Sequence, residues 1–289
     1  ITWPRVLDVN DRALRHIVTG LGGRIDGVTR QSSFDITPAS EVMVIMSLAT
    51  SLKDLRERLG RIVIGRSKSG KWITAEDLQA AGAMTALLRD ALQPNLLRTS
   101  ENTPVLIHTG PFGNIATGCS SVVADLIAAQ HADYVVTEAG FGADMGAERF
   151  FDLKCAVSGL RPHAAVLVTT VRSLKSHSGK FKITAGKGLP EQMLAENPQD
   201  VRAGQANLLK HIEIVRGFGM EPVVAINVFP TDHESELVEI EAIAREAGAR
   251  VARSYGVVRG GEGCTELAQA VEQACQASEG QNQARPLYE

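Results

Sequence analysis

Short apolar runs rich in β-branched residues alternate along this chain with longer amphipathic stretches. The runs that predict buried strands cover residues 103–110, 133–140, 163–171 and 221–229. The stretches that predict helices lie between and after them, at residues 114–132, 146–159, 207–219 and 231–248. This alternation predicts an α/β fold in which a mostly parallel sheet carries helices on both faces.

The first hundred residues have a different pattern. Two long helical stretches, 38–60 and 74–92, flank one short apolar run at 61–65. We therefore expect residues 1–102 to form a helical flank and residues 103–289 to form the α/β region.

Local signals predict where some of these helices begin. Thr74 can cap a helix that has Glu76 and Asp77 in its first turn. Thr231 and Glu234 have the spacing of a capping box at the start of a later helix.

Two further segments depart from the regular pattern. Residues 175–201 are rich in Gly, Lys and Pro and predict a surface excursion or lid. The polar end at 278–289 predicts a frayed tail.

Composition narrows the classes of function. Hydrophobic residues make up 44% of the chain and charged residues 22%, which is ordinary for a globular protein. The net charge of -3 gives no attraction to nucleic acid or to anionic membranes, so we expect small molecules and protein subunits as partners. No apolar run reaches the ~20 residues that span a bilayer, and the first residues lack a signal-peptide pattern, so we expect a cytoplasmic protein.

The cysteines are far apart in the sequence. Cys119, Cys155, Cys264 and Cys275 include no C-x-x-C pair and have no His at the spacing of a metal ligand. We expect reduced, mostly buried thiols rather than a metal site. Because the chain begins at Ile1 rather than at Met, we also expect it to be a piece of a longer protein.

A phosphate-binding loop is suggested by one stretch, "GRSKSGKW". Gly65, Gly70 and Lys71 have the right spacing, but Trp72 stands where a Mg²⁺-binding hydroxyl is needed. The next helix also begins with acidic residues that repel phosphate. We interpret the stretch as a lysine-bearing surface turn.

Polar residues follow each predicted strand, and ligands of parallel sheets collect at the carboxyl ends of the strands. His108 and His177 are candidates for acid-base chemistry, because imidazole titrates near neutral pH. Arg172 and Lys175 are candidates for binding anionic groups. Asn227 follows a buried strand and is a candidate for contacting a nucleotide base. Capping and strand termination explain any single one of these loops better than a ligand site does, but four such loops at one edge favour a site.

Several long motifs occur in order along nearly the whole chain. They include "RHIVTGLGG", "FDITPASEVM", "LKDLRERLGRIV", "TAEDLQAAGAMTALLRDAL", "GPFGNIATGCSSV", "ADYVVTEAGFGADMGAERFFDLKC", "TVRSLKSHSG", "NLLKHIEIVRGFG" and "VVAINVFPTDHESEL". Together they resemble formate–tetrahydrofolate ligase, also called 10-formyltetrahydrofolate synthetase.

This resemblance implies a P-loop NTPase-like core. It implies an enzyme that activates formate with MgATP as formyl phosphate and passes the formyl group to tetrahydrofolate. It also implies a monovalent cation in many members and a homotetramer in bacterial ones. The family's P-loop and its "GGAAGGGY" segment lie upstream of this sequence, and its C-terminal region lies beyond "PLYE". The resemblance therefore implies a central fragment, inactive alone, in which 1–102 belongs partly to the nucleotide-binding core and 103–289 binds folate and nucleotide.

The resemblance also assigns residues to the folate pocket. The family's pterin-lining Phe residues correspond to Phe141 and Phe229, with Pro230 beside the latter. Val257 stands where the family has Trp, which reduces the flat area for stacking. Thr117 and Ser120 replace the family's usual His and Asn.

Two alternatives remain open at this stage. One is a different ATP-dependent ligase with a P-loop NTPase core. The other is an inactive relative that serves as a binding or assembly module, which the departures at Thr117, Ser120 and Val257 favour.

Overall fold

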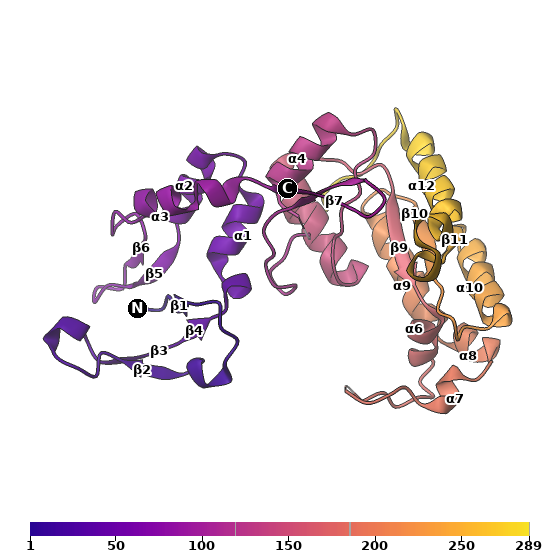
Figure 1. Cartoon of the computed structure of the whole chain (residues 1–289), viewed down its shortest axis with the longest axis horizontal. Coiled ribbons are helices and arrows are strands. Elements are labelled where there is room, and N and C mark those ends of the chain that lie inside the picture. The colour runs from indigo at the N-terminus through magenta and orange to yellow at the C-terminus, as the bar shows by residue number, and fades with distance from the viewer. Residues whose placement is uncertain (119, 185, 289) are drawn as a thin grey trace. The chain divides into compact units, whose positions relative to one another are not determined.

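The chain folds into two compact units, Ile1–Phe141 and Gly142–Glu289 (Figure 1). The computed structural model describes residues 1–118, 120–184 and 186–288. The division expected after residue 102 falls inside the first unit. Cys119 lies outside the described residues.

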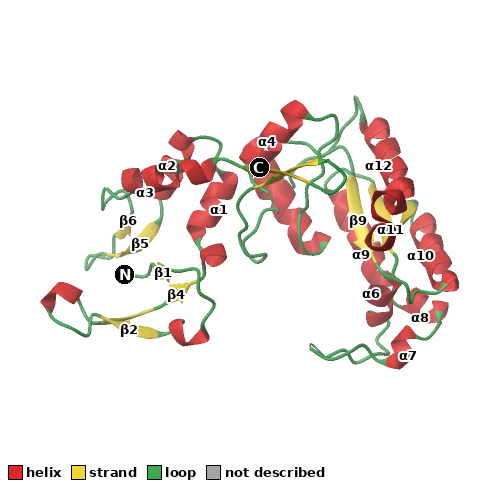
Figure 2. Ribbon diagram, viewed as in Figure 1, coloured by secondary structure: helices red, strands yellow, loops and turns green. Residues whose placement is uncertain are grey.

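The first unit combines helices with short strands (Figure 2). Its helices and strands are β1 (Arg5–Val6), β2 (Ile17–Thr19), β3 (Arg30–Ser32), β4 (Phe34–Asp35), α1 (Glu41–Leu48), α2 (Leu52–Gly60), β5 (Val63–Arg66), β6 (Trp72–Thr74), α3 (Ala81–Leu88), β7 (Asn95–Arg98), β8 (Pro104–Ile107) and α4 (Val122–His131). Single 3₁₀ turns lie at Arg12–Leu14, Arg24–Asp26, Thr37–Ala39 and Asp90–Leu92. Its strands pair two by two, with β1 and β4 parallel and the pairs β2–β3, β5–β6 and β7–β8 antiparallel.

A small apolar core holds α1, α2 and the β5–β6 hairpin together. Met46 of α1 packs with Leu55 and Leu59 of α2, and with Ile62 and Ile64 at the start of the hairpin. The i, i+4 spacing of the two leucines places them on one face of α2. The predicted helical stretch 38–60 is therefore present, as two helices.

The helix predicted to begin near Thr74 begins instead at Ala81. Thr74 is the last residue of β6, and the carboxylate of Asp77 accepts hydrogen bonds from its backbone N–H at 2.9 Å and its hydroxyl at 3.1 Å. These short-range bonds close a turn that competes with a helix. The prediction that Thr74 caps a helix is therefore wrong.

The strand predicted at 133–140 is also wrong. These residues form no strand, and Tyr134 and Val136 are 58% and 93% exposed. The predicted strand before it exists as β8, but its partner is β7 across a short loop, which makes an antiparallel hairpin. A strand persists only where its backbone groups find a partner, and among the described strands none pairs with 133–140.

The second unit contains the parallel sheet. Its elements are π-helical turns at Ala143–Ala147 and Phe150–Cys155, α5 (Ala156–Ser158), β9 (Ala165–Thr169), α6 (Val171–Ser176), α7 (Glu191–Leu194), α8 (Pro198–Ala203), α9 (Gln205–Gly217), β10 (Pro222–Asn227), α10 (Glu234–Glu246), β11 (Arg250–Ser254), α11 (Gly256–Arg259), a 3₁₀ turn at Gly260–Cys264, and α12 (Thr265–Ser278). No helix in the described ranges is long and apolar enough to cross a membrane.

The three strands of this sheet lie in the order β11-β10-β9, and all are parallel. Helices α6, α8, α9 and α10 share one core with Val224 and Ile226 of β10. Val223 and Ala225 on the opposite face are buried as well, and α12 contacts β10 and β11. The predicted parallel α/β arrangement with helices on both faces is therefore confirmed for this unit, over three strands.

The C-terminal segment is docked rather than frayed, contrary to the expectation. The side-chain amide of Asn282 donates to the carbonyl oxygens of Arg161 and Pro162, at 3.3 and 3.0 Å. The backbone N–H of Arg285 donates to the carbonyl oxygen of Phe218 at 3.1 Å. These bonds hold the polar tail against residues that precede β9 and against the end of α9.

The described cysteines carry no disulfide. Cys155 is buried, while Cys264 and Cys275 are half-buried. Burial raises the pKa of the Cys275 thiol.

Candidate functional site

The carboxyl edge of the parallel sheet is the natural place for a site in the second unit. β9 ends at Thr169, β10 at Asn227 and β11 at Ser254. Because the strands are parallel and in register, the segments that follow them leave the sheet at the same edge.

An aromatic ring backed by a guanidinium lies at this edge. Arg172, in the first turn of α6, has its guanidinium carbon 4.0 Å from the centre of the Phe229 ring. Its Nη2 also donates to the hydroxyl of Thr231 at 2.9 Å. The Arg172 Nε–H is buried and has no hydrogen-bond partner in the part of the chain that the structure describes. One face of the half-buried Phe229 ring is thus occupied by a planar cation, and Pro230 beside it is exposed.

The loop that carries Phe229 is closed by Asp232. Its carboxylate accepts the backbone N–H of Phe229 at 2.9 Å, and its own N–H donates to the Phe229 carbonyl oxygen at 3.0 Å. The pKa of Asp232 is raised, mainly by burial. The hydrogen bond from Phe229 and the charge of Arg172 oppose that shift, while the nearby Glu236 adds to it.

The segment after β11 begins beside this loop. The backbone N–H of Val228 donates to the carbonyl oxygen of Ser254 at 3.0 Å. Three residues further on, Val257 of α11 is 78% exposed. Asn227 is half-buried at the last position of β10, where it pairs with Ser254. Asn227 and Val257 are therefore brought to the same edge as Phe229.

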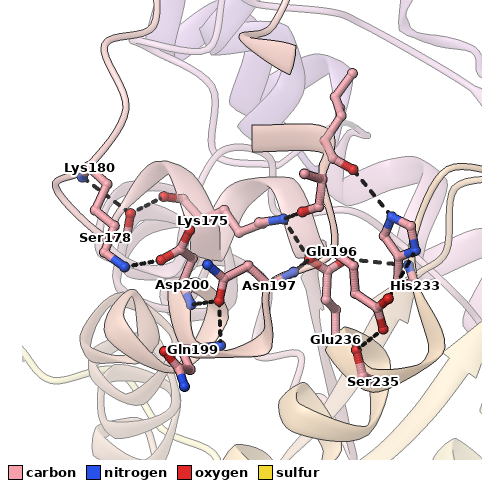
Figure 3. A network of polar contacts seen from close by, with 12 residues as sticks. Lys175, Ser178, Lys180, Glu196, Asn197, Gln199, Asp200, His233, Ser235 and Glu236 are labelled. Atoms are coloured by element: carbon pink, nitrogen blue, oxygen red, sulfur yellow. Dashed lines mark hydrogen bonds and ion pairs between the residues drawn. The ribbon is translucent and has the colours of Figure 1, made fainter. Parts of the chain in front are cut away.

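Two further predicted residues lie on α6 or directly after it, in different surroundings. The ammonium of Lys175 is enclosed, 2.5 Å from a carboxylate oxygen of Glu236 and 2.7 Å from the carbonyl oxygen of Ala195 (Figure 3). His177 is the exposed residue that ends the helix. The position of Lys175 favours an internal role over direct contact with a ligand.

The capping box of α10 is shifted from the predicted position. The N-cap is His233 rather than Thr231, and the carboxylate that reaches back to it belongs to Glu236 rather than Glu234. Glu236 was not among the predicted site residues. Glu234 is turned instead to Arg253 of β11, at 2.8 Å.

In the first unit, His108 is an internal residue. Its Nε2–H donates to the carbonyl oxygen of Ala91 at 2.8 Å, since a carbonyl can only accept. Its Nδ1 lies 2.6 Å from the hydroxyl of Ser121, the N-cap of α4. The imidazole therefore links β8 to the start of α4.

Phe141 ends the first unit on its surface. Its side chain is 70% exposed, and its backbone has a φ of 51°, which is uncommon for a bulky residue. Its ring lies over Gly113, where an added Cβ would come within 1.6 Å of it. Only glycine at position 113 leaves room for the ring in this position.

Two other features singled out in the sequence also belong to the first unit. Residues 67–71 form the turn between β5 and β6, and residues 68–71 are exposed, so the surface-turn interpretation is confirmed for these residues, whereas Gly65 is buried in β5. Thr117 is 1% exposed, and its hydroxyl lacks a hydrogen-bond partner among the residues described. In the same described ranges, no group of three or more His, Cys, Asp or Glu side chains could hold a metal ion.

The amino-acid sequence of the chain is similar to a family model and to several named proteins. A family model described as formate–tetrahydrofolate ligase matches residues 1–289. Two proteins named formate–tetrahydrofolate ligase, from Saccharopolyspora erythraea and Cutibacterium acnes, are 63% and 62% identical to this chain over 288 and 275 residues. These matches cover 100% and 95% of the chain but 50% and 49% of those proteins. Formate–tetrahydrofolate ligase 3 of Rubrobacter xylanophilus is 61% identical over 279 residues, 96% of the chain and 49% of that protein. The chain thus spans about half the length of the curated relatives it matches.

Proposed function

This chain belongs to the formate–tetrahydrofolate ligase family, and we propose that the whole protein uses ATP to join formate to tetrahydrofolate, giving 10-formyltetrahydrofolate. The observation that carries this proposal is the 63% identity to a ligase of that name along 100% of the chain. On this proposal the relatives' other half supplies the phosphate-binding groups of a P-loop NTPase-like core, and this chain alone binds folate without catalysing the reaction.

The proposed reaction has two steps. A formate oxygen attacks the γ-phosphorus of ATP, and ADP leaves, which forms formyl phosphate. N10 of tetrahydrofolate then attacks the formyl carbon, phosphate leaves, and the nitrogen loses its proton. Mg²⁺ enters with ATP as part of the substrate. The protein contributes positioning and electrostatic stabilisation rather than covalent chemistry.

We place the folate contact at the carboxyl edge of the parallel sheet, on Arg172, Phe229, Pro230 and Asp232, which we name the folate platform. A pterin is a flat heteroaromatic ring, and Phe229 offers it a face while Arg172 covers the other. The exposed Val257 adds an aliphatic contact in place of a second aromatic face. Phe229 directly follows the buried strand β10, and Asp232 closes the loop that carries it. Both features support a folate platform that is formed before the ligand binds.

The other assignments follow from the same proposal. Asn227 contacts the nucleotide base, and the exposed His177 contacts an anionic group of a substrate. Two assignments in the first unit stay predictions: Phe141 as a folate contact and His108 as an acid-base group. A monovalent cation, a homotetramer and a cytoplasmic location also stay predictions.

Calorimetric titration of this chain with tetrahydrofolate tests the proposal. We expect binding, and we expect Phe229→Leu to weaken it about tenfold, since one stacked aromatic contact contributes about 0.5–1.5 kcal/mol beyond its buried area. Tyr288→Leu is the matched control, because Tyr288 is an exposed aromatic residue in the docked C-terminal segment. Absence of binding by a folded chain, or equal weakening by both variants, would contradict the folate platform.

A further inference from the structure

Lys175 and Glu236 form an ion pair that solvent does not reach. Each side chain is 1% exposed, and the ammonium nitrogen lies 2.5 Å from the nearer carboxylate oxygen (Figure 3). Taking two charges out of water is costly, so a buried pair contributes little net stability compared with apolar residues of the same volume. Its presence therefore requires a reason other than stability.

The pair joins three separate segments of the chain. The ammonium of Lys175 on α6 also donates to the carbonyl oxygen of Ala195 at 2.7 Å. One oxygen of Glu236 on α10 accepts the backbone N–H of Asn197 at 2.9 Å, and the other accepts that of His233 at 3.3 Å. Figure 3 shows Asn197 and His233 beside the Glu236 carboxylate, with dashed lines marking these contacts.

Both members of the pair lie about one helical turn from a group that holds Phe229. Lys175 follows Arg172 by three positions on α6, and the Arg172 guanidinium covers the Phe229 ring. Glu236 follows Asp232 by four positions, and the Asp232 carboxylate binds the Phe229 N–H. A shift of α6 against α10 would therefore separate Arg172 from the ring.

Other contacts between these segments are closer to solvent. Lys180 pairs with Asp200, but its side chain is 53% exposed. The hydroxyl of Ser235 donates at 2.6 Å to Glu196, which is 55% exposed. Exposed pairs contribute little, so the enclosed pair is the polar contact best placed to fix α6 against α10, in addition to the apolar core that the two helices share.

We propose that Lys175 and Glu236 are positioning residues: their buried ion pair fixes α6 against α10, keeps Arg172 on the Phe229 ring, and secures residues 195–197, which lead into α8. The identity of the ligand rests on the proposed function, but the geometric part of the proposal does not. Neither residue contacts the ligand itself.

The geometric part is tested by nuclear magnetic resonance of this chain. The Arg172 Nε–H is buried beside the face of Phe229, so its proton resonance should be shifted upfield by the ring, and Arg172→Lys identifies it by its disappearance. The test variant combines Lys175→Met with Glu236→Gln, which removes both charges and preserves volume. We expect it to lose at least half of the upfield shift. Ile243→Ala is the matched control, because Ile243 lies on α10 in the same core, seven positions and so about two helical turns from Glu236.

The control separates positioning from general stability. It should lower stability while leaving the resonance in place. If the Arg172 Nε–H resonance of the double variant is shifted upfield as far as in the parent chain, the proposal is overturned. If the double variant does not fold, Lys175→Leu combined with Glu236→Gln, which also removes both charges and leaves no buried charge unpaired, is expected to give the same loss.

The functional part is tested by titration with tetrahydrofolate. We expect the double variant to bind at least tenfold more weakly than the parent, and Ile243→Ala to bind within twofold of it. Loss of the shift with unchanged affinity would overturn the role in ligand binding, as would loss of affinity with an unchanged shift. If the parent itself does not bind, the proposed function fails, while the resonance still decides whether the pair positions Arg172.

Discussion

The enclosed pair allows an energetic prediction that does not depend on any ligand. Lys175→Met removes the ammonium and leaves the Glu236 carboxylate 1% exposed, with two backbone N–H groups as its remaining donors. Breaking a buried pair in this way typically costs about 3–5 kcal/mol, because the remaining charge has lost its partner. Since Glu236 keeps two hydrogen bonds, we expect the low end, about 3 kcal/mol. The combination of Lys175→Met with Glu236→Gln should recover most of that loss.

The two tryptophans make the assay selective. Trp3 and Trp72 both lie in the first unit, so tryptophan fluorescence reports its unfolding, whereas far-ultraviolet circular dichroism reports both units. With a urea dependence of about 2 kcal/mol per molar, a loss of about 3 kcal/mol lowers the midpoint by about 1.5 M. We expect Lys175→Met to lower the midpoint of the second unit's dichroism change by that amount and to leave the fluorescence midpoint unchanged.

A surface pair serves as the control. Lys210 pairs with Glu213 on α9, and both side chains are more than 60% exposed, so Lys210→Met should cost less than about 0.5 kcal/mol. If Lys175→Met costs no more than Lys210→Met, the ion pair is not energetically coupled to the fold. If the double variant is as unstable as Lys175→Met, the loss comes from packing rather than from an unpaired charge. Either result refutes the reasoning.

Three further predictions concern the second unit. The raised pKa of Asp232 means that its contribution to stability is fully present below the ordinary value of 3.8 and is lost as pH rises through the raised value. Asp232→Asn should therefore flatten the fall of the unfolding free energy over that window, measured by urea titrations at stepped pH; an unchanged slope would count against the assignment. Gly204→Ala should destabilise the unit by about 3 kcal/mol, because its Cβ would lie 1.8 Å from the Leu174 carbonyl oxygen, and a dichroism midpoint equal to the parent's would contradict it. Asn282→Ala should cost about 1–2 kcal/mol through its lost bonds, at 3.0 Å to Pro162 among them, and should speed proteolysis of the C-terminal segment; equal cleavage rates would argue that the segment is not docked.

The sequence predicted a strand best where the composition of the segment itself was enough to identify it. β10 is apolar on both faces and is buried on both, so its local composition was sufficient. The stretch at 133–140 also contains a β-branched run, at 135–137, but it pairs with none of the described strands, and pairing is not a local property. β11 was missed for the opposite reason, because Arg250 and Arg253 interrupt its apolar pattern. The Arg253 guanidinium is held by carboxylates of α10, among them Glu241 at 2.6 Å, which the local pattern does not reveal.

The candidate site was predicted as a set of loops, without the contacts within it. The carboxyl edge of a parallel sheet follows from the order of strands and helices, so Arg172, Asn227 and Phe229 could be assigned to one edge from the sequence. That Arg172 covers Phe229 could not, since the two residues are far apart in the sequence and their contact depends on how α6 packs.

Arg172 and Lys175 show what decides between a half-buried and a fully buried charge on the same helix. Three positions apart, they lie on one face of α6, and both point to the segment that leads into α10. Arg172 meets Thr231 before that helix begins, where the chain is at the sheet edge. Lys175 meets Glu236 inside the first turn, where core packs around the pair. Because the N-cap of α10 is His233 rather than Thr231, Glu236 and not Glu234 lies opposite Lys175. Because the N-cap was predicted two residues too early, the sequence did not reveal that Glu236 is the buried partner of Lys175. Lys175 was therefore predicted to bind an anionic ligand group instead.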